Sequence, residues 1–131
     1  MKRDILTVAF PTDDEVNFIN RHFGDATMFA LYTISPNKLK YKKSVLNKSE
    51  EEKTHADPKK AKSISKILKE QNVDILVGRA FGGNILRMKK HFVCVKCDFT
   101  KIEDSFETLL KNFDRIVVEL QKGEARDYLV I

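Results

Sequence analysis

The chain has 131 residues, of which 42% are hydrophobic and 33% are charged, and this balance predicts one globular domain and excludes a disordered chain. Its net charge of +5, carried mostly by lysine, suits an anionic partner, but we favour a solvated lysine- and glutamate-rich surface as its explanation. The longest apolar run is too short for a membrane helix or a secretory signal, and two cysteines cannot build a disulfide scaffold, so we expect a cytoplasmic protein with no membrane partner.

Three β-prone segments occupy the first part of the chain. Residues 5–10 are apolar and end at Pro11, and residues 28–34 end at the turn-forming residues 35–37. Residues 39–46 form a third such segment. The short connections between these segments predict an antiparallel meander.

Helix and strand patterns alternate in the second half, after a charged segment at residues 47–55 that predicts a loop. Asp57 before Pro58 predicts a helix N-cap with proline at the first helical position. The expected elements are, in order, a helix over 59–71, a strand over 73–77, a helix over 84–91, a strand over 92–96 and a helix over 102–112. Such alternation predicts parallel strands with crossover helices. We therefore predict an α/β fold with a mixed five-stranded sheet, three antiparallel strands followed by two parallel strands, and helices on its faces. The first strand should neighbour the fourth.

A C-terminal extension, residues 114–131, follows the predicted domain of residues 1–113. Two β-prone runs at 115–120 and 128–131 flank a glycine-containing turn, which predicts extra strands or a hairpin. Because four consecutive apolar residues at the end would be costly in water, we expect them to pack on the domain or to pair with a second subunit as a homo-oligomer.

Two loops carry residues that suit ligand binding. Residues 22–26 (His-Phe-Gly-Asp-Ala) precede the second strand, and residues 78–84 (Gly-Arg-Ala-Phe-Gly-Gly-Asn) lie between a strand and a helix. A glycine-rich turn from strand to helix directs backbone N–H groups outward, where an anion is favoured, and Arg79 can neutralise charge there. The glycine spacing matches neither a Walker A motif nor the dinucleotide fingerprint, and glycines that merely turn the chain are an equally good explanation from these residues alone.

Cys94 and Cys97 have the Cys-x-x-Cys spacing of metal and redox sites. Residues three apart in one regular strand point to opposite faces, so the pair cannot share a metal there. We expect Cys94 to be a buried small hydrophobic residue. Cys97, at the end of its strand, is the better candidate for a thiolate ligand.

The two loops in their strand contexts resemble the dinitrogenase iron–molybdenum cofactor biosynthesis family over roughly residues 5 to 112. The segments that carry the resemblance are Phe10-Pro11, residues 22–32, residues 73–78 and residues 81–84. The resemblance implies a ribonuclease-H-like sheet and a capacity to hold an anionic metal–sulfur cluster of the iron–sulfur or iron–molybdenum type. Gly83 stands where the family often has proline after the glycine. His22 carries over as the candidate ligand, although its ring could instead only shape the loop.

We therefore expect a non-catalytic carrier or accessory protein that binds an anionic metal cluster or a similar anion and meets an acceptor or donor protein. The alternative is a metal-free protein-interaction or regulatory module. The expected metal ligands are His22 and Cys97, and the cluster-binding residues are His22, Arg79, Phe81, Gly82, Gly83 and Asn84.

Neither an enzyme nor a nucleic-acid binder is favoured. A two-metal nuclease needs clustered carboxylates, but residues 5–10 contain none, Asp74 opens its strand at the opposite end from the glycine loop, and Asp98 is isolated. No Ser/His/Asp or Cys/His nucleophile pattern is present. Only Tyr41 is interleaved with the lysines around it, where single-strand binding would need several aromatic rings.

Overall fold

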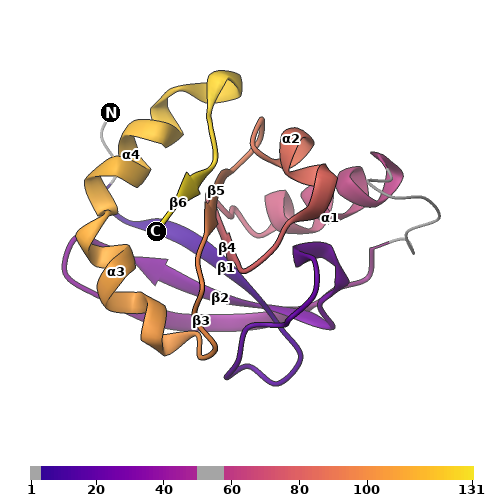
Figure 1. Ribbon diagram of the computed structural model, residues 1–131, viewed down its shortest axis with the longest axis horizontal. Helices are drawn as coiled ribbons and strands as arrows, with labels where there is room; N and C mark the ends of the chain where they lie inside the picture. The colour runs from indigo at the N-terminus through magenta and orange to yellow at the C-terminus, as the bar shows by residue number, and fades with distance from the viewer. Residues whose placement is uncertain (1–3, 50–57) are drawn as a thin grey trace.

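The computed structural model describes residues 4–49 and 58–131, and its centre is a mixed sheet with the strand order β3-β2-β1-β4-β5-β6 (Figure 1). The strands are β1 (Leu6–Thr12), β2 (Met28–Ile34), β3 (Leu39–Leu46), β4 (Ile75–Gly78), β5 (Val93–Lys96) and β6 (Leu129–Val130). Strand β2 pairs antiparallel with both β1 and β3, whereas β4 is parallel to β1, β5 to β4, and β6 to β5.

The expected meander, the parallel second half and the contact between the first and fourth strands are thus confirmed. The expected number of five strands is wrong, because the C-terminal residues add a sixth. The Ile131 N–H donates to the Lys96 carbonyl at 3.0 Å, and the buried Leu129 side chain holds the short strand against the core.

Helices cover both faces of the sheet. They are α1 (Pro58–Glu70), α2 (Ile85–Met88), α3 (Phe106–Lys111) and α4 (Phe113–Gln121), and none in the described ranges is long and apolar enough to cross a membrane. Helices α1 and α2 pack on one face and α3 and α4 on the other (Figure 1). Residues 50–55 of the expected charged loop and the expected N-cap Asp57 lie outside the described residues.

The two faces of the sheet carry separate cores because side chains alternate along each strand. In β1, Leu6, Val8 and Phe10 join the core under α3 and α4, whereas Ala9 joins the core under α1 and α2. Every residue of β1 is buried, as expected for a central strand covered on both sides.

The strand expected at residues 115–120 is also wrong, because this run lies inside helix α4. Its β-branched residues favour a strand locally, but Phe113 and Ile116 are buried three positions apart, with Leu120 four further on and packed against the same core. This helical spacing decides the outcome, because one face of α4 can then cover the sheet.

Parallel strands β1, β4 and β5 end at the same edge of the sheet. The chain leaves this edge into residues 13–27 after β1, into residues 79–84 after β4 and at Cys97 after β5. Both of the expected ligand-binding loops therefore belong to one end of the molecule, where ligands collect in α/β sheets.

Candidate functional site

Two loops form the candidate site, the His22 loop (residues 22–26) and the Gly82 loop (residues 78–84). The Phe23 N–H donates to the Ala80 carbonyl at 2.8 Å, which ties one loop to the other. Asn47, just after β3, donates through its side-chain nitrogen to two carbonyl oxygens of the His22 loop, both at 2.8 Å. These bonds fix the backbone of the His22 loop on both sides.

Three phenylalanine rings lie beneath the loops and hold them on the sheet. The Phe23 ring stacks on Phe81 with centroids 5.1 Å apart and an interplanar angle of 8°, and on Phe29 of β2 at 5.2 Å and 19°. Phe81 is only 5% exposed, so its ring packs inside the protein and is not offered to solvent. Phe81 was expected as a ligand-binding residue, and its buried ring directly precedes the two glycines of the Gly82 loop.

His22 and Gly82 are in direct contact. Gly82 has φ +65°, and a Cβ atom built on it would lie 2.7 Å from Nδ1 and 2.8 Å from Cε1 of the His22 ring. Only glycine fits this position, because any side chain would have an unfavourable backbone conformation and would overlap the imidazole. The expected proximity of His22 and Gly82 at one sheet edge is confirmed.

Gly24 allows the His22 loop to approach helix α1. A Cβ atom on Gly24 would lie 2.5 Å from Cδ1 of Ile64 and 3.2 Å from Cε of Lys60. Ile64 and Lys60 are one helical turn apart, so they present neighbouring side chains to the loop. The His-Phe-Gly sequence thus serves three contacts in succession, with the second loop, the aromatic stack and α1.

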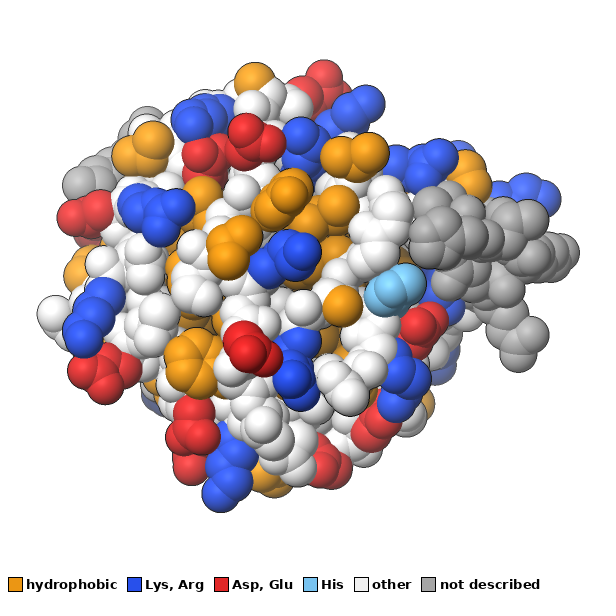
Figure 2. All heavy atoms as spheres, viewed as in Figure 1, with side chains coloured by type: hydrophobic (Ala, Val, Ile, Leu, Met, Phe, Trp, Pro, Cys, Tyr) orange, Lys and Arg blue, Asp and Glu red, His pale blue; other side chains and the backbone are white. Residues whose placement is uncertain are grey.

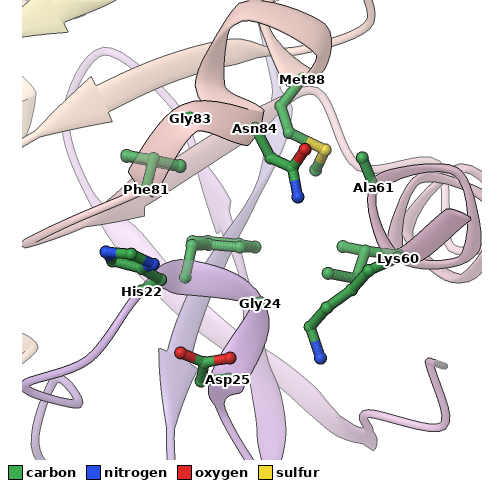
Figure 3. A pocket seen from close by; sticks show the side chains of 11 residues that line it. His22, Gly24, Asp25, Lys60, Ala61, Phe81, Gly83, Asn84 and Met88 are labelled. Atoms are coloured by element: carbon green, nitrogen blue, oxygen red, sulfur yellow. The ribbon is translucent and has the colours of Figure 1, made fainter. Parts of the chain in front are cut away.

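A small pocket of about 20 Å³ remains between the two loops and α1 (Figure 3). This volume holds about one water molecule. The Asn84 amide points into the space, and the Met88 thioether and Ala61 close its far side. The charged groups in the lining are the Lys60 ammonium and the Asp25 carboxylate.

The structure brings some of the expected site residues together and separates others. His22, Phe81, Gly83 and Asn84 all line the pocket. Arg79 does not line it, and its guanidinium contacts the exposed Asp98 carboxylate at 3.2 Å. The guanidinium that was expected to neutralise the charge of a ligand is therefore paired with the carboxylate of Asp98, which follows β5.

The two cysteines point to opposite faces, as their spacing predicts. Cys94 belongs to the core under α1 and α2, and Cys97 to the core under α3 and α4. Burial raises the pKa of the Cys94 thiol to about 12 and also raises the pKa of Cys97. Both thiols are therefore protonated at neutral pH, and Cys97 lies outside the lining of the His22 pocket.

The described residues near His22 offer few groups that could bind a metal. Across residues 4–49 and 58–131, no three His, Cys, Asp or Glu side chains come together as a metal-holding group. A pocket of about 20 Å³ cannot enclose a cluster of several metal and sulfur atoms. The polar side chains of the described lining include one imidazole, one amide, one ammonium group and one carboxylate, and a cluster bound to them would lie mostly outside the pocket.

Several lining residues were not among the expected site residues, and two of them, Phe23 and Lys60, matter most for the site. Phe23 was named only as part of its motif, and Lys60 stands within a run of helical lysines that appeared uniformly solvated. Lys60 is only 8% exposed because it shares a face of α1 with the buried Ile64, at a spacing of four residues. That spacing is the sequence signal that distinguishes Lys60 from its neighbours.

Comparison with known proteins identifies the loop-bearing part of the chain. A family model described as "Dinitrogenase iron-molybdenum cofactor" matches residues 4–112, which covers the strands β1 to β5 and both loops of the site. The matched range ends before helix α4 and strand β6. No curated protein matches the chain.

Proposed function

The chain belongs to the dinitrogenase iron-molybdenum cofactor family, as its sequence resemblance indicates, and on this basis we propose a function. We propose that the protein is a non-catalytic carrier or accessory protein whose cargo is an anionic metal–sulfur cluster. As part of the same proposal we place its sheet in the ribonuclease-H-like class. The order β3-β2-β1-β4-β5, in which β2 runs against its neighbours, supports that placement.

The observation that carries the proposal is the contact between the two loops. His22 and Gly82 are sixty positions apart in the chain, yet the imidazole ring lies against the glycine at a distance that excludes any side chain. An imidazole held in this way keeps a fixed orientation at the carboxyl edge of the sheet, where a cargo can reach it. Imidazole nitrogen is a suitable ligand for iron and for other transition metals.

The same geometry explains why a carrier fits better than a tight metal site. A single imidazole supplies one protein–metal bond, while the Lys60 ammonium and the Asn84 amide can interact with the anionic surface of the cargo. Most of the cluster would remain exposed to a receiving protein. Few bonds to the carrier would need to break during transfer, which is what delivery to an acceptor requires.

The test is anaerobic reconstitution with iron and sulfide, and separately with molybdate, followed by desalting and metal analysis. We expect the wild-type protein to retain metal and His22→Ala to lose most of it without a change in circular dichroism. His91→Ala is the matched control, because His91 is an exposed histidine outside the His22 pocket. Equal retention by His22→Ala and wild type would remove His22 as the ligand. No retention by any variant would favour the metal-free interaction module.

A further inference from the structure

A second concave surface lies on the other side of helix α1 from the Gly24 contact. It is an open groove of about 1230 Å³ between α1 and the end of α2. Its cationic lining residues are Lys59, Lys62, Lys66, Lys69, Arg87 and Lys90. Among the described residues of this lining, Glu70 is the single carboxylate. Figure 2 shows Lys and Arg side chains along the upper right margin of the molecule, over α1 and α2.

The lysines of α1 form one continuous row. Lys59, Lys62, Lys66 and Lys69 follow each other at intervals of three, four and three residues, which places them on one side of the helix. Like charges at this spacing repel and destabilise a helix. In the described part of the chain, neither Lys62 nor Lys66 forms an ion pair.

A hydrogen bond joins the two walls of the groove. The Lys69 ammonium of α1 lies 3.0 Å from Nδ1 of His91, which follows α2. Because an ammonium group only donates, the His91 nitrogen accepts, and the two walls are held together in the absence of a partner. The groove is therefore a preformed surface.

We propose that this basic groove is the docking surface for an acidic segment of a partner protein. The charge complementarity requires an anion. The row from Lys59 to Lys69 on helix α1 is about 15 Å long, enough for about four residues of extended chain. Among the described lining residues, the only ring on which a nucleic-acid base could stack is the His91 imidazole, whereas single-strand binding uses several aromatic rings. The Glu70 carboxylate would repel a phosphodiester backbone, whereas a protein segment of mixed charge can pair with it.

The groove also adjoins the candidate site. Ala61 of α1 lines both the groove and the His22 pocket. A partner docked on the basic row would thus lie beside the place where the cargo is held, and this part of the inference rests on the proposed function. The basic charge of the groove implies that the docking partner has an acidic surface. Membership of the family does not by itself specify the charge of a partner.

The test measures binding of a fluorescein-labelled peptide of alternating glutamate and alanine by fluorescence anisotropy, at low and at high salt. We expect the metal-free wild-type protein to bind it and the groove variant K62E/K66E/K69E to bind at least about tenfold more weakly. The control variant K38E/K40E/K42E makes the same change in net charge on exposed lysines of β3 and its preceding turn, and it should retain most of the binding. Melting curves verify that both variants are folded.

Two results would overturn the proposal. Equal weakening by both triple variants would show that the peptide responds only to net charge. Tighter, groove-dependent binding of a single-stranded thymidine oligonucleotide of equal charge would make the partner a nucleic acid. His22→Ala should bind the peptide as the wild type does, so a failed metal reconstitution and a failed docking surface give separate results.

Discussion

Replacing Gly82 by alanine tests the contact on which the site depends. The new Cβ atom meets two separate obstacles, the left-handed backbone at φ +65° and the His22 ring at 2.7 Å. Gly123 provides a matched control, because its φ of +62° is nearly the same and no atom lies within 4 Å of a Cβ built there. The difference between the two alanine variants therefore isolates the overlap with the imidazole.

The expected magnitudes follow from this comparison. Placing alanine in the left-handed region costs about 1–2 kcal/mol of unfolding free energy, and this is the whole effect expected for Gly123→Ala. Gly82→Ala should lose a further ~1–3 kcal/mol, the usual cost of forcing an extra methyl group into packed space. In the double variant Gly82→Ala/His22→Ala the overlap disappears, so its loss should be smaller than the sum of the two single losses.

Urea unfolding followed by circular dichroism measures these differences. A common denaturant slope among the variants would verify that they share one unfolding reaction. The reasoning fails if Gly82→Ala is no less stable than Gly123→Ala, or if the double variant is fully additive. Either result would mean that the His22 ring does not rest on Gly82 in solution.

Two further predictions follow from buried groups. Burial raises the pKa of the Cys94 thiol to about 12 and also raises the pKa of Cys97. We therefore expect both thiols to resist iodoacetamide at pH 8 in the folded protein and to react once urea unfolds it. Rapid modification of Cys97 in the folded protein, detected by mass spectrometry, would restore Cys97 as an accessible ligand. Burial opposes ionisation of Glu119, but Lys122 and the Asp127 N–H outweigh it and lower its pKa below the ordinary 4.5. The ionised Glu119 carboxylate stabilises the fold fully above pH 4.5, and this stabilisation is lost as the pH falls through the pKa of the folded state. Glu119→Gln should therefore reduce the slope of the free energy of unfolding against pH on the acid side. An unchanged slope would contradict this assignment.

The order of the elements could be predicted because local patterns and tertiary packing agree over most of the chain. The apolar residues of β1 and β4 suit buried strands, and the helical spacing of α1 matches its buried face. The agreement fails at residues 115–120, where β-branched residues lie in α4. There the sheet needs a helical cover, and tertiary packing overrides local preference.

The site was predictable only in part for a related reason. His22 and the glycines stand in short motifs, so their approximate location follows from which strands their loops connect. The contact between His22 and Gly82, the aromatic stack and the position of Lys60 depend on three segments meeting in space. No local pattern encodes such a meeting, although the four-residue spacing of Lys60 and Ile64 marks the lysine that turns inward.

The two edges of the sheet are protected in different ways against pairing with other molecules. Edge strand β3 has exposed lysines at 40, 42 and 43, and its pairing with β2 shifts register so that Lys42 has no direct partner. At the other edge, β6 offers only two residues, and without it the buried Val93–Val95 segment of β5 would be the open edge. Charge and a bulge on one side, and shortness on the other, both discourage edge-to-edge aggregation. Strand β6 lies outside the family-matched residues 4–112. Removing it should therefore reduce the solubility of the protein while leaving the His22 loop intact.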